Sequence, residues 1–318
     1  VGAACDLLEG LTREPDLGYG PQWPAEVLRH GDWIDIDVYL AHSDVWSCAP
    51  TLRRYREVGK RGVGRVGEAF GRRVRALLDR RAAPSVICVE KPYLDGFIEG
   101  FGQARCAPFV LLAVNGGDEP FTREQQSRVA LLRDLRACFV NNMHLPSDSD
   151  LFHPLPIGLN GEAFIGIILQ SALPWKQRDR RLLVPPMRIT NRLRAQYIEV
   201  LTRPEYGSLV RIVSERLGLE DFLALLSQHQ SVLSPPGRGY DCARTWQALA
   251  IGSVPLVVDD PGFDQRLHAL AGPEYIPLPQ DLSPDTLEKL LSQLSDPAEY
   301  AERVHAEYWK NMWASHLE

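Results

Sequence analysis

The sequence has 318 residues, of which 45% are hydrophobic, so it can bury globular cores, and its length predicts two domains. Its formal net charge of −6 excludes a protein that holds nucleic acid or an anionic membrane through overall positive charge. No stretch approaches the roughly 20 apolar residues of a membrane-spanning helix. The chain begins with Val1 rather than methionine, so the loss of an N-terminal signal or anchor stays open.

The first half of the chain alternates short apolar runs with amphipathic stretches. Strands are expected at 33–40, 85–90, 108–114 and 136–141, and helices at 65–81 and 122–135. This alternation predicts one α/β unit. The segment 152–161 follows this unit and is rich in proline and glycine, so it is predicted to be a linker.

The same alternation restarts beyond this linker. Strands are expected at 180–186, 208–214, 231–236 and 254–260, and helices at 191–203, 219–228, 241–252, 262–271, 284–294 and 297–314. The sequence therefore predicts two domains, 1–158 and 159–318. Ligands of open parallel sheets bind at the carboxyl ends of the strands, so we expect the site in a cleft between the two units.

The six cysteines form no CxxC pair and no zinc-type cluster. Cys88 and Cys138 lie in apolar runs, where a buried cysteine acts as a small hydrophobic residue. A pairing of Cys5 with Cys48 in an oxidising compartment stays open.

The segment SPPGRGYDCARTWQALAIGSVPLVV, residues 234–258, has the features of an anion site. Gly237 and Gly239 allow the backbone to approach a ligand, and Asp241 is placed to cap the helix that follows. The helix N-terminus offers unpaired N–H groups, and Arg244 in its first turn adds a guanidinium suited to phosphate oxygens. A glycine turn with a surface arginine is the alternative. This segment contains neither GxxxxGK[ST] nor GxGxxG, so it is not the phosphate loop of an ATPase or of a nicotinamide dehydrogenase.

This segment resembles the signature of exostosin-like glycosyltransferases of the algal, viral and bacterial type, in which a P-x-G turn precedes an Arg-aromatic-Glu-Ala-Leu helix and a Gly-x-x-Pro-Val strand. HPLPIGLNG at 153–161 and NRLRAQYIEVL at 191–201 resemble two further elements of that family. VEKPYLDGFIEGF and PFVLLAVNGGDEP are similar to upstream segments of its algal-type members. The resemblance covers residues 85–260 and is strongest at 234–258.

The resemblance implies an α/β fold of the GT-B class, with two Rossmann-like domains facing each other across a cleft and a C-terminal helix crossing back to the N-terminal domain. The N-terminal domain would bind a glycan or other hydroxyl acceptor, and the C-terminal domain a nucleoside-diphosphate sugar, UDP-sugar first. Transfer would invert the anomeric centre, with no metal and no cofactor. Eukaryotic members of the family work in the Golgi lumen.

The residues expected at the donor site combine this resemblance with the pattern of charges and glycines. They are Arg188, Asn191, Arg192, Gly237, Arg238, Gly239, Tyr240, Asp241, Arg244 and Gln247. We expect one arginine among Arg188, Arg192 and Arg194 to contact the diphosphate. Pro156, Gly158 and Asn160 are expected at the hinge.

Gln247 departs from the family pattern, which commonly has glutamate at this position. A glutamine can still hydrogen-bond ribose hydroxyls, but it lacks the charge, and one acceptor oxygen is replaced by a donor. The alternative function is therefore a catalytically inactive carbohydrate-binding or scaffold protein with the same fold.

A base for the acceptor hydroxyl is expected from the first domain. Asp118 is ranked first because it follows an apolar strand, with Glu119 beside it, and Asp95 is ranked second. An acidic turn that caps the helix near residue 121 explains the first two equally well.

Two patterns of residues are of the kind that can hold a metal ion. Asp35 and Asp37 share one face of a predicted strand, which strand geometry alone produces. His144 and His153 lie near the linker, where His153 precedes a proline and packing explains it equally well. We therefore predict no metal site.

Overall fold

The structure, a computed structural model, describes residues 45–46, 64, 67–72, 74–76, 78–79, 85–103, 105–114, 121–143, 149–159, 162–237, 239–258, 276–278, 282–297 and 304–318. These residues form two compact units. The first contains the described residues up to Leu155 together with Trp309–Glu318, and the second contains Pro156–Tyr308. Each unit is an α/β unit with a parallel sheet, so the predicted α/β class is confirmed.

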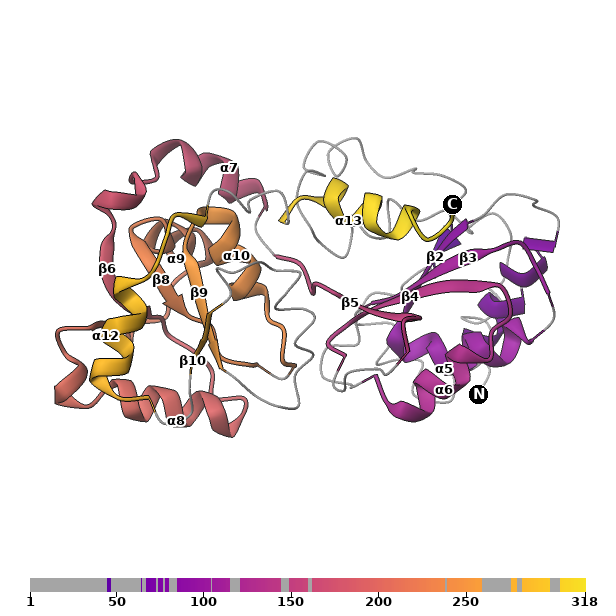
Figure 1. Ribbon diagram of the computed structural model, residues 1–318, viewed down its shortest axis with the longest axis horizontal. Coiled ribbons are helices and arrows are strands. Elements are labelled where there is room, and N and C mark those ends of the chain that lie inside the picture. The colour runs from indigo at the N-terminus through magenta and orange to yellow at the C-terminus, as the bar shows by residue number, and fades with distance from the viewer. Residues whose placement is uncertain are drawn as a thin grey trace, which may run out of the picture. The chain divides into compact units, whose positions relative to one another are not determined.

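The first unit has a five-stranded parallel sheet in the order β1-β2-β3-β4-β5. Its strands are β1 (Val45–Trp46), β2 (Ser85–Glu90), β3 (Phe109–Val114), β4 (Leu135–Asn141) and β5 (Phe152–Leu155). Helices α5 (Lys91–Phe101) and α6 (Arg123–Ala130) connect β2 to β3 and β3 to β4, and they lie on the same face of the sheet (Figure 1). When parallel strands follow one another across a sheet in chain order, right-handed connections place all the connecting helices on the same face. All of β3 is buried, which explains its uninterrupted apolar sequence.

The predicted linker begins too early. Residues Phe152–Leu155 form β5, which pairs with β4 at the edge of the described sheet. Pro154 made this segment look unlike a strand, because proline has no N–H to donate. An edge strand tolerates that loss, since one of its sides needs no partner.

The C-terminal residues belong to the first unit. Helix α13 (Ala306–Ala314) buries Trp309 and Trp313, and His316 follows it. The ring of His316 lies 4.7 Å from that of His153 and 5.5 Å from that of Phe139, measured between centroids. His153 also stacks on Phe139 at 4.9 Å, as the packing interpretation of this residue predicts.

Cys88 and Cys138 are fully buried, as predicted, whereas Cys5 and Cys48 lie outside the described residues. Where the structure describes the chain, no group of three or more His, Cys, Asp or Glu side chains is placed to hold a metal ion. None of its described helices is long and apolar enough to cross a membrane.

Glycines allow the helical residues 67–72 to pack closely against α5. A Cβ atom on Gly100 would lie 2.7 Å from the Glu68 carbonyl carbon and 2.9 Å from its Cα atom. A Cβ atom on Gly71 would lie 2.7 Å from the Phe101 backbone nitrogen. Side chains cannot enter these contacts without moving backbone, so both positions require glycine.

We therefore expect Gly100→Ala to destabilise the protein by about 1–3 kcal/mol, the usual cost of overpacking. The sign is diagnostic, because alanine normally stabilises a helix by about 1 kcal/mol relative to glycine. Gly166→Ala is the matched control, since Gly166 lies in helix α7 (Glu162–Ser171) and a Cβ atom there meets nothing within 4 Å. Urea unfolding of the two variants measures both changes. A Gly100→Ala variant that gains stability as the control does would contradict the proposed close packing.

The second unit has a parallel sheet in the order β10-β9-β8-β6-β7. Its strands are β6 (Asp179–Val184), β7 (Val210–Ile212), β8 (His229–Leu233), β9 (Val254–Val258) and β10 (Ile276–Leu278). Its helices besides α7 are α8 (Arg192–Leu201), α9 (Leu219–Leu226), α10 (Ala243–Ile251) and α12 (Pro284–Ser292). The short strand β10 and helix α7 were not predicted from the sequence, and the predicted helix at 262–271 lies outside the described residues.

The strand order of this sheet creates a place for a ligand. From β6 the chain crosses to β7 on one side, and it then returns past β6 to β8 on the other side. Helix α8 therefore lies on one face, whereas α9 and α10 lie on the other (Figure 1). The loops that leave β6 and β8 diverge to opposite faces, and the crevice that opens at their carboxyl ends is where ligands of such sheets bind.

Candidate anion-binding site

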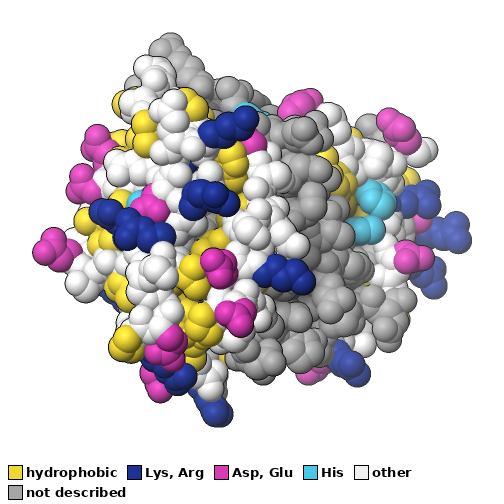
Figure 2. Space-filling model, turned by 60° about the vertical axis from the view of Figure 1, so that its left-hand side comes forward, with side chains coloured by type: hydrophobic (Ala, Val, Ile, Leu, Met, Phe, Trp, Pro, Cys, Tyr) yellow, Lys and Arg dark blue, Asp and Glu magenta, His cyan; other side chains and the backbone are white. Residues whose placement is uncertain are grey.

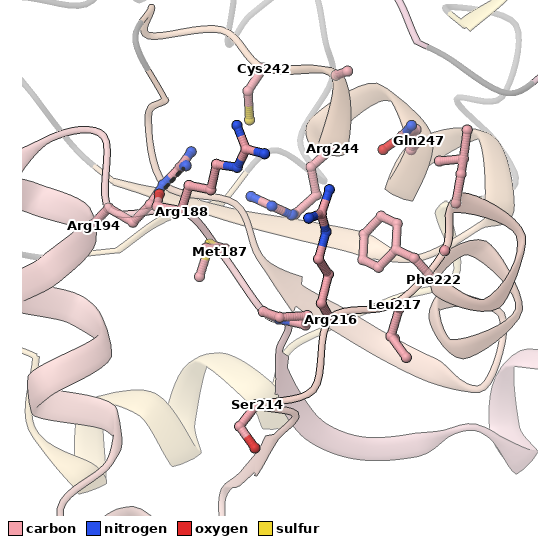
Figure 3. A pocket seen from close by; sticks show the side chains of 14 residues that line it. Met187, Arg188, Arg194, Ser214, Arg216, Leu217, Phe222, Cys242, Arg244 and Gln247 are labelled. Atoms are coloured by element: carbon pink, nitrogen blue, oxygen red, sulfur yellow. Dashed lines mark hydrogen bonds between the residues drawn. The ribbon is translucent and has the colours of Figure 1, made fainter.

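A pocket of about 660 Å³ lies at the carboxyl ends of β7, β6 and β8 in the second unit. Its lining comes from three segments of the chain, which are residues 186–194 after β6, residues 214–222 after β7 and residues 242–247 at the start of α10. The predicted strands and the turn at 234–240 thus lead to one site. Figure 3 shows the side chains that surround it.

Among the described residues that line this pocket there are four arginines and no aspartate or glutamate. The side chains of Arg188, Arg216 and Arg244 point toward one another in Figure 3. None of the ion pairs found among the described residues involves these three or Arg194. On the face drawn in Figure 2, by contrast, basic and acidic side chains are interspersed. Positive charge is therefore concentrated locally in a chain that is acidic overall.

Arg194 supports the walls of the pocket. Its guanidinium donates hydrogen bonds to the carbonyl oxygens of Arg188, at 2.8 Å, and Pro235, at 3.2 Å. Burial lowers the pKa of Arg194, and the positive charge of Arg244 lowers it further. Arg194 therefore joins the loop after β6 to the loop after β8, in addition to contributing positive charge.

Asn191 links the turn at Pro236 and Gly237 to the start of α8 through hydrogen bonds. Its side-chain oxygen caps the helix by accepting from the Arg194 backbone N–H, at 2.9 Å. Its side-chain nitrogen donates to the carbonyl oxygens of Pro236, at 2.9 Å, and Gly237, at 2.7 Å. A Cβ atom on Gly237 would lie 3.2 Å from an Arg194 guanidinium nitrogen, so the absence of a side chain permits this tight packing. Asn191 and Gly237 thus shape the pocket without lining it.

Arg244 lies in the first turn of α10. It is the second residue of α10, it is partly buried, and burial lowers the pKa of its guanidinium. Its buried Nε atom has no hydrogen-bond partner among the described residues. Its guanidinium carbon lies 5.9 Å from the centroid of the Phe222 ring. A bound anion would supply both the missing hydrogen-bond acceptor and the missing negative charge.

The predicted N-cap at Asp241 is wrong by one residue. Cys242 occupies the N-cap position and makes no side-chain capping hydrogen bond. The Asp241 carboxylate is buried, with 2% of its surface exposed, and it accepts from the Ile157 backbone N–H at 2.7 Å and from Trp246 Nε1 at 2.8 Å. Burial raises the pKa of Asp241 to about 7, although these hydrogen bonds lower it. Asp241 therefore anchors the start of α10 to the segment after β5.

The other predicted donor residues divide into three groups. Gln247 lines the pocket and is almost fully buried. Arg192 is exposed, Tyr240 is partly buried, and neither they nor Gly239 line the pocket. Arg238 lies outside the described residues.

The predicted hinge residues lie beside the Asp241 anchor. Pro156 and Gly158 flank Ile157 and are both buried, and Gly158 has a φ of +83°, which favours glycine. Asn160 lies outside the described residues.

The candidate bases, and the residues for which a metal role was considered and rejected, mostly lie outside the described residues. Asp118, Glu119, Asp35, Asp37 and His144 all lie outside the described residues. Asp95 is exposed on α5 and pairs with Arg128 of α6 at 3.0 Å. This ion pair links two helices on one face of the first sheet.

Sequence reasoning missed the part of the pocket that follows β7. Ser214, Arg216 and Phe222 come from this segment, which the sequence analysis treated only as the end of a strand and the start of a helix. The available signal was the predicted strand at 208–214, because any loop at its carboxyl end reaches the ligand-binding edge of the sheet. What was missing was the knowledge that β7 lies directly beside β6.

No protein-family model and no curated protein matches the chain. Among solved structures, it is similar to an α,α-trehalose 6-phosphate synthase from Burkholderia multivorans, with 13% identity and a TM-score of 0.45 over 88% of this chain and 77% of that one. It is also similar to a UDP-forming α,α-trehalose-phosphate synthase from Burkholderia xenovorans in complex with glucose-6-phosphate (11% identity, TM-score 0.47, 81% and 78% covered). A third is the glycosyltransferase SnogD from Streptomyces nogalater (15% identity, TM-score 0.33, 94% and 82% covered). Each is a likeness in fold.

Proposed function

We propose that this protein is an exostosin-like glycosyltransferase that transfers a sugar from a nucleoside-diphosphate sugar, UDP-sugar first, to a hydroxyl of a glycan or other acceptor. One observation carries the proposal. The described lining of a pocket at the switch point of a parallel sheet, beside the N-terminus of α10, contains four arginines and no carboxylate. This combination suits a diphosphate, which carries its charge on oxygens that accept several hydrogen bonds.

The same arrangement supplies what the reaction needs at its leaving group. When the bond between sugar and diphosphate breaks, negative charge develops on the diphosphate oxygens. Arg188, Arg216, Arg244 and the N–H groups at the start of α10 would stabilise that charge. Because side chains and backbone provide the positive charge, the proposed reaction uses no metal ion. Gln247 lies one turn beyond Arg244 and would approach the ribose hydroxyls.

The acceptor half of the reaction is proposed for the first unit. A carboxylate there, Asp118 first and Asp95 second, would take the proton from the acceptor hydroxyl as it attacks the anomeric carbon from the side opposite the diphosphate. Such a single displacement inverts the anomeric centre. A eukaryotic source would place the protein in the Golgi lumen.

The test of the donor site is a thermal-shift screen with UDP, GDP, ADP and CMP. A ligand that binds only the folded state raises the melting temperature. At a ligand concentration of 100 times its Kd, it adds about 2.7 kcal/mol to the free energy of unfolding. We expect one nucleoside diphosphate to raise the melting temperature, and CMP to do so less, because it carries a single phosphate. Absence of a shift with every nucleotide at millimolar concentration would contradict the proposal.

One observation favours a second function, that of a catalytically inactive carbohydrate-binding or scaffold protein. Gln247 replaces the glutamate common in the resembled family, and it lines the pocket. Release of nucleoside diphosphate from the donor separates the two functions. We expect the wild type to release it, whereas release only after Gln247→Glu would support the inactive alternative.

A further inference from the structure

Arg244 has an unusual electrostatic setting for an arginine that is partly buried. Its charge costs free energy to bury, and in proteins this cost is commonly met by a carboxylate within ion-pair distance. In the described part of the chain, Arg244 forms neither an ion pair nor a side-chain hydrogen bond, and its Nε atom is buried without a partner. No acid among the described residues therefore holds this side chain in place.

The Phe222 ring is the group that contacts the Arg244 guanidinium. The guanidinium carbon lies 5.9 Å from the ring centroid, within the range of a cation–π interaction. Phe222 belongs to α9, whereas Arg244 begins α10, and these two helices pack against each other on one face of the sheet. Both side chains line the pocket and are labelled in Figure 3.

An aromatic partner has a consequence that a carboxylate would not have. A carboxylate would orient the guanidinium but would also neutralise it and occupy its N–H donors. The face of a phenyl ring attracts the cation through its quadrupole, carries no net charge and accepts no conventional hydrogen bond from the in-plane N–H groups. The guanidinium is thereby restrained while its charge and its donors stay available to an anion.

We propose that Phe222 is a positioning residue that holds the Arg244 guanidinium in the pocket for a phosphate group without neutralising its charge. This proposal deepens the proposed function, on which it rests for the identity of the anion as the diphosphate of a sugar donor. Phe222 acts through Arg244, so removing the ring should matter only while Arg244 is present.

A double-mutant cycle tests this dependence. Affinities for inorganic pyrophosphate, UDP and uridine would be measured by titration calorimetry for the wild type, Phe222→Leu, Arg244→Ala and the double variant. We expect Phe222→Leu to weaken pyrophosphate and UDP about five-fold, and to change either affinity by less than about 1.5-fold in the Arg244→Ala background. Uridine affinity should stay within about two-fold, because uridine has no phosphate. Phe222→Tyr keeps an aromatic face and should restore the wild-type affinities.

Each other outcome has a defined meaning. An equal loss of pyrophosphate affinity in the presence and absence of Arg244 would overturn the proposal, because the effect of Phe222 would then not depend on Arg244. A loss confined to uridine and UDP would also overturn it and would show that Phe222 contacts the nucleoside. If the protein binds pyrophosphate but no nucleoside diphosphate, the proposed function is contradicted, and the mutant cycle measured with pyrophosphate still decides the role of Phe222. If the protein binds neither pyrophosphate nor a nucleoside diphosphate, both proposals are overturned. Should Phe222→Leu fail to fold, Phe222→Met replaces it in the cycle, because its flexible side chain fills irregular space.

Discussion

Replacement of Arg244 by alanine is expected to weaken binding of UDP, or of whichever nucleoside diphosphate binds, by about 10- to 100-fold. This range corresponds to about 1.5–3 kcal/mol, the contribution of hydrogen bonds that involve a charged group. Arg244 lies in the first turn of α10 with a buried Nε that has no partner where the structure describes the chain, so a bound diphosphate would gain charge and donors together. Titration calorimetry with the purified variant measures the loss.

The matched control is Arg192→Ala, which removes an exposed arginine from the start of α8 that does not line the pocket. We expect its affinity to stay within about two-fold of the wild type, because exposed charges contribute little. Arg244→Lys should recover part of the loss, since lysine keeps the charge but lacks the planar fork. Equal losses in the Arg192 and Arg244 variants would mean that general positive charge, and not this site, attracts the nucleotide.

Replacement of Asp241 by asparagine is expected to change how stability depends on pH. The folded protein holds the pKa of Asp241 at about 7, above its ordinary value of 3.8, because burial disfavours the charge. Between these values the folded state keeps a proton that the unfolded state releases, so the stability contributed by this group is present below pH 3.8 and is lost as the pH rises through 7. From pH 5 to pH 8 the loss amounts to about 2–3 kcal/mol.

At pH 5 the Asp241→Asn variant should be less stable than the wild type by about 2 kcal/mol. With its oxygen in place of Oδ2, the asparagine would still accept from Ile157, but its amide nitrogen would replace Oδ1 and face the Trp246 Nε1–H donor, so two donors would meet there. The difference should shrink as the pH rises to 8, because only the wild type carries the titrating carboxyl group. Urea unfolding at pH 5, 6.5 and 8 measures the free energy of unfolding for both proteins.

Asp241→Ala is the internal control for this measurement. It also removes the titrating group, so its difference from the wild type should change with pH to the same extent. At pH 5 its free energy of unfolding should be about 3 kcal/mol below that of the wild type, a larger difference than for Asp241→Asn, because both Ile157 and Trp246 lose their acceptor. A difference from the wild type that does not vary with pH, in either variant, would show that Asp241 is not protonated in the folded protein near neutral pH.

Some features of this protein depend only on residues near one another in the chain, and these were predictable. The alternation of apolar runs and amphipathic stretches predicted the α/β class and located β2, β3, β4, β6 and β8 to within a few residues. The periods of strands and helices involve residues two to four positions apart, so a single sequence displays them. The candidate anion site also has local features of this kind, because strand, glycine turn and helix start are consecutive and Arg244 lies in the first turn.

Other features depend on pairs of segments far apart in the chain, and only the tertiary structure decided them. Arg216 and Phe222 join the pocket because β7 lies beside β6, and strand order follows from burial across the whole sheet. Asp241 became an anchor instead of a helix cap because the backbone N–H of Ile157, 84 residues away, reaches its carboxylate. The short edge strands β5 and β10 also needed their partners, since a few residues with proline show no strand pattern of their own. The sequence by itself thus determined the type of fold and one wall of the site, whereas long-range packing completed the site.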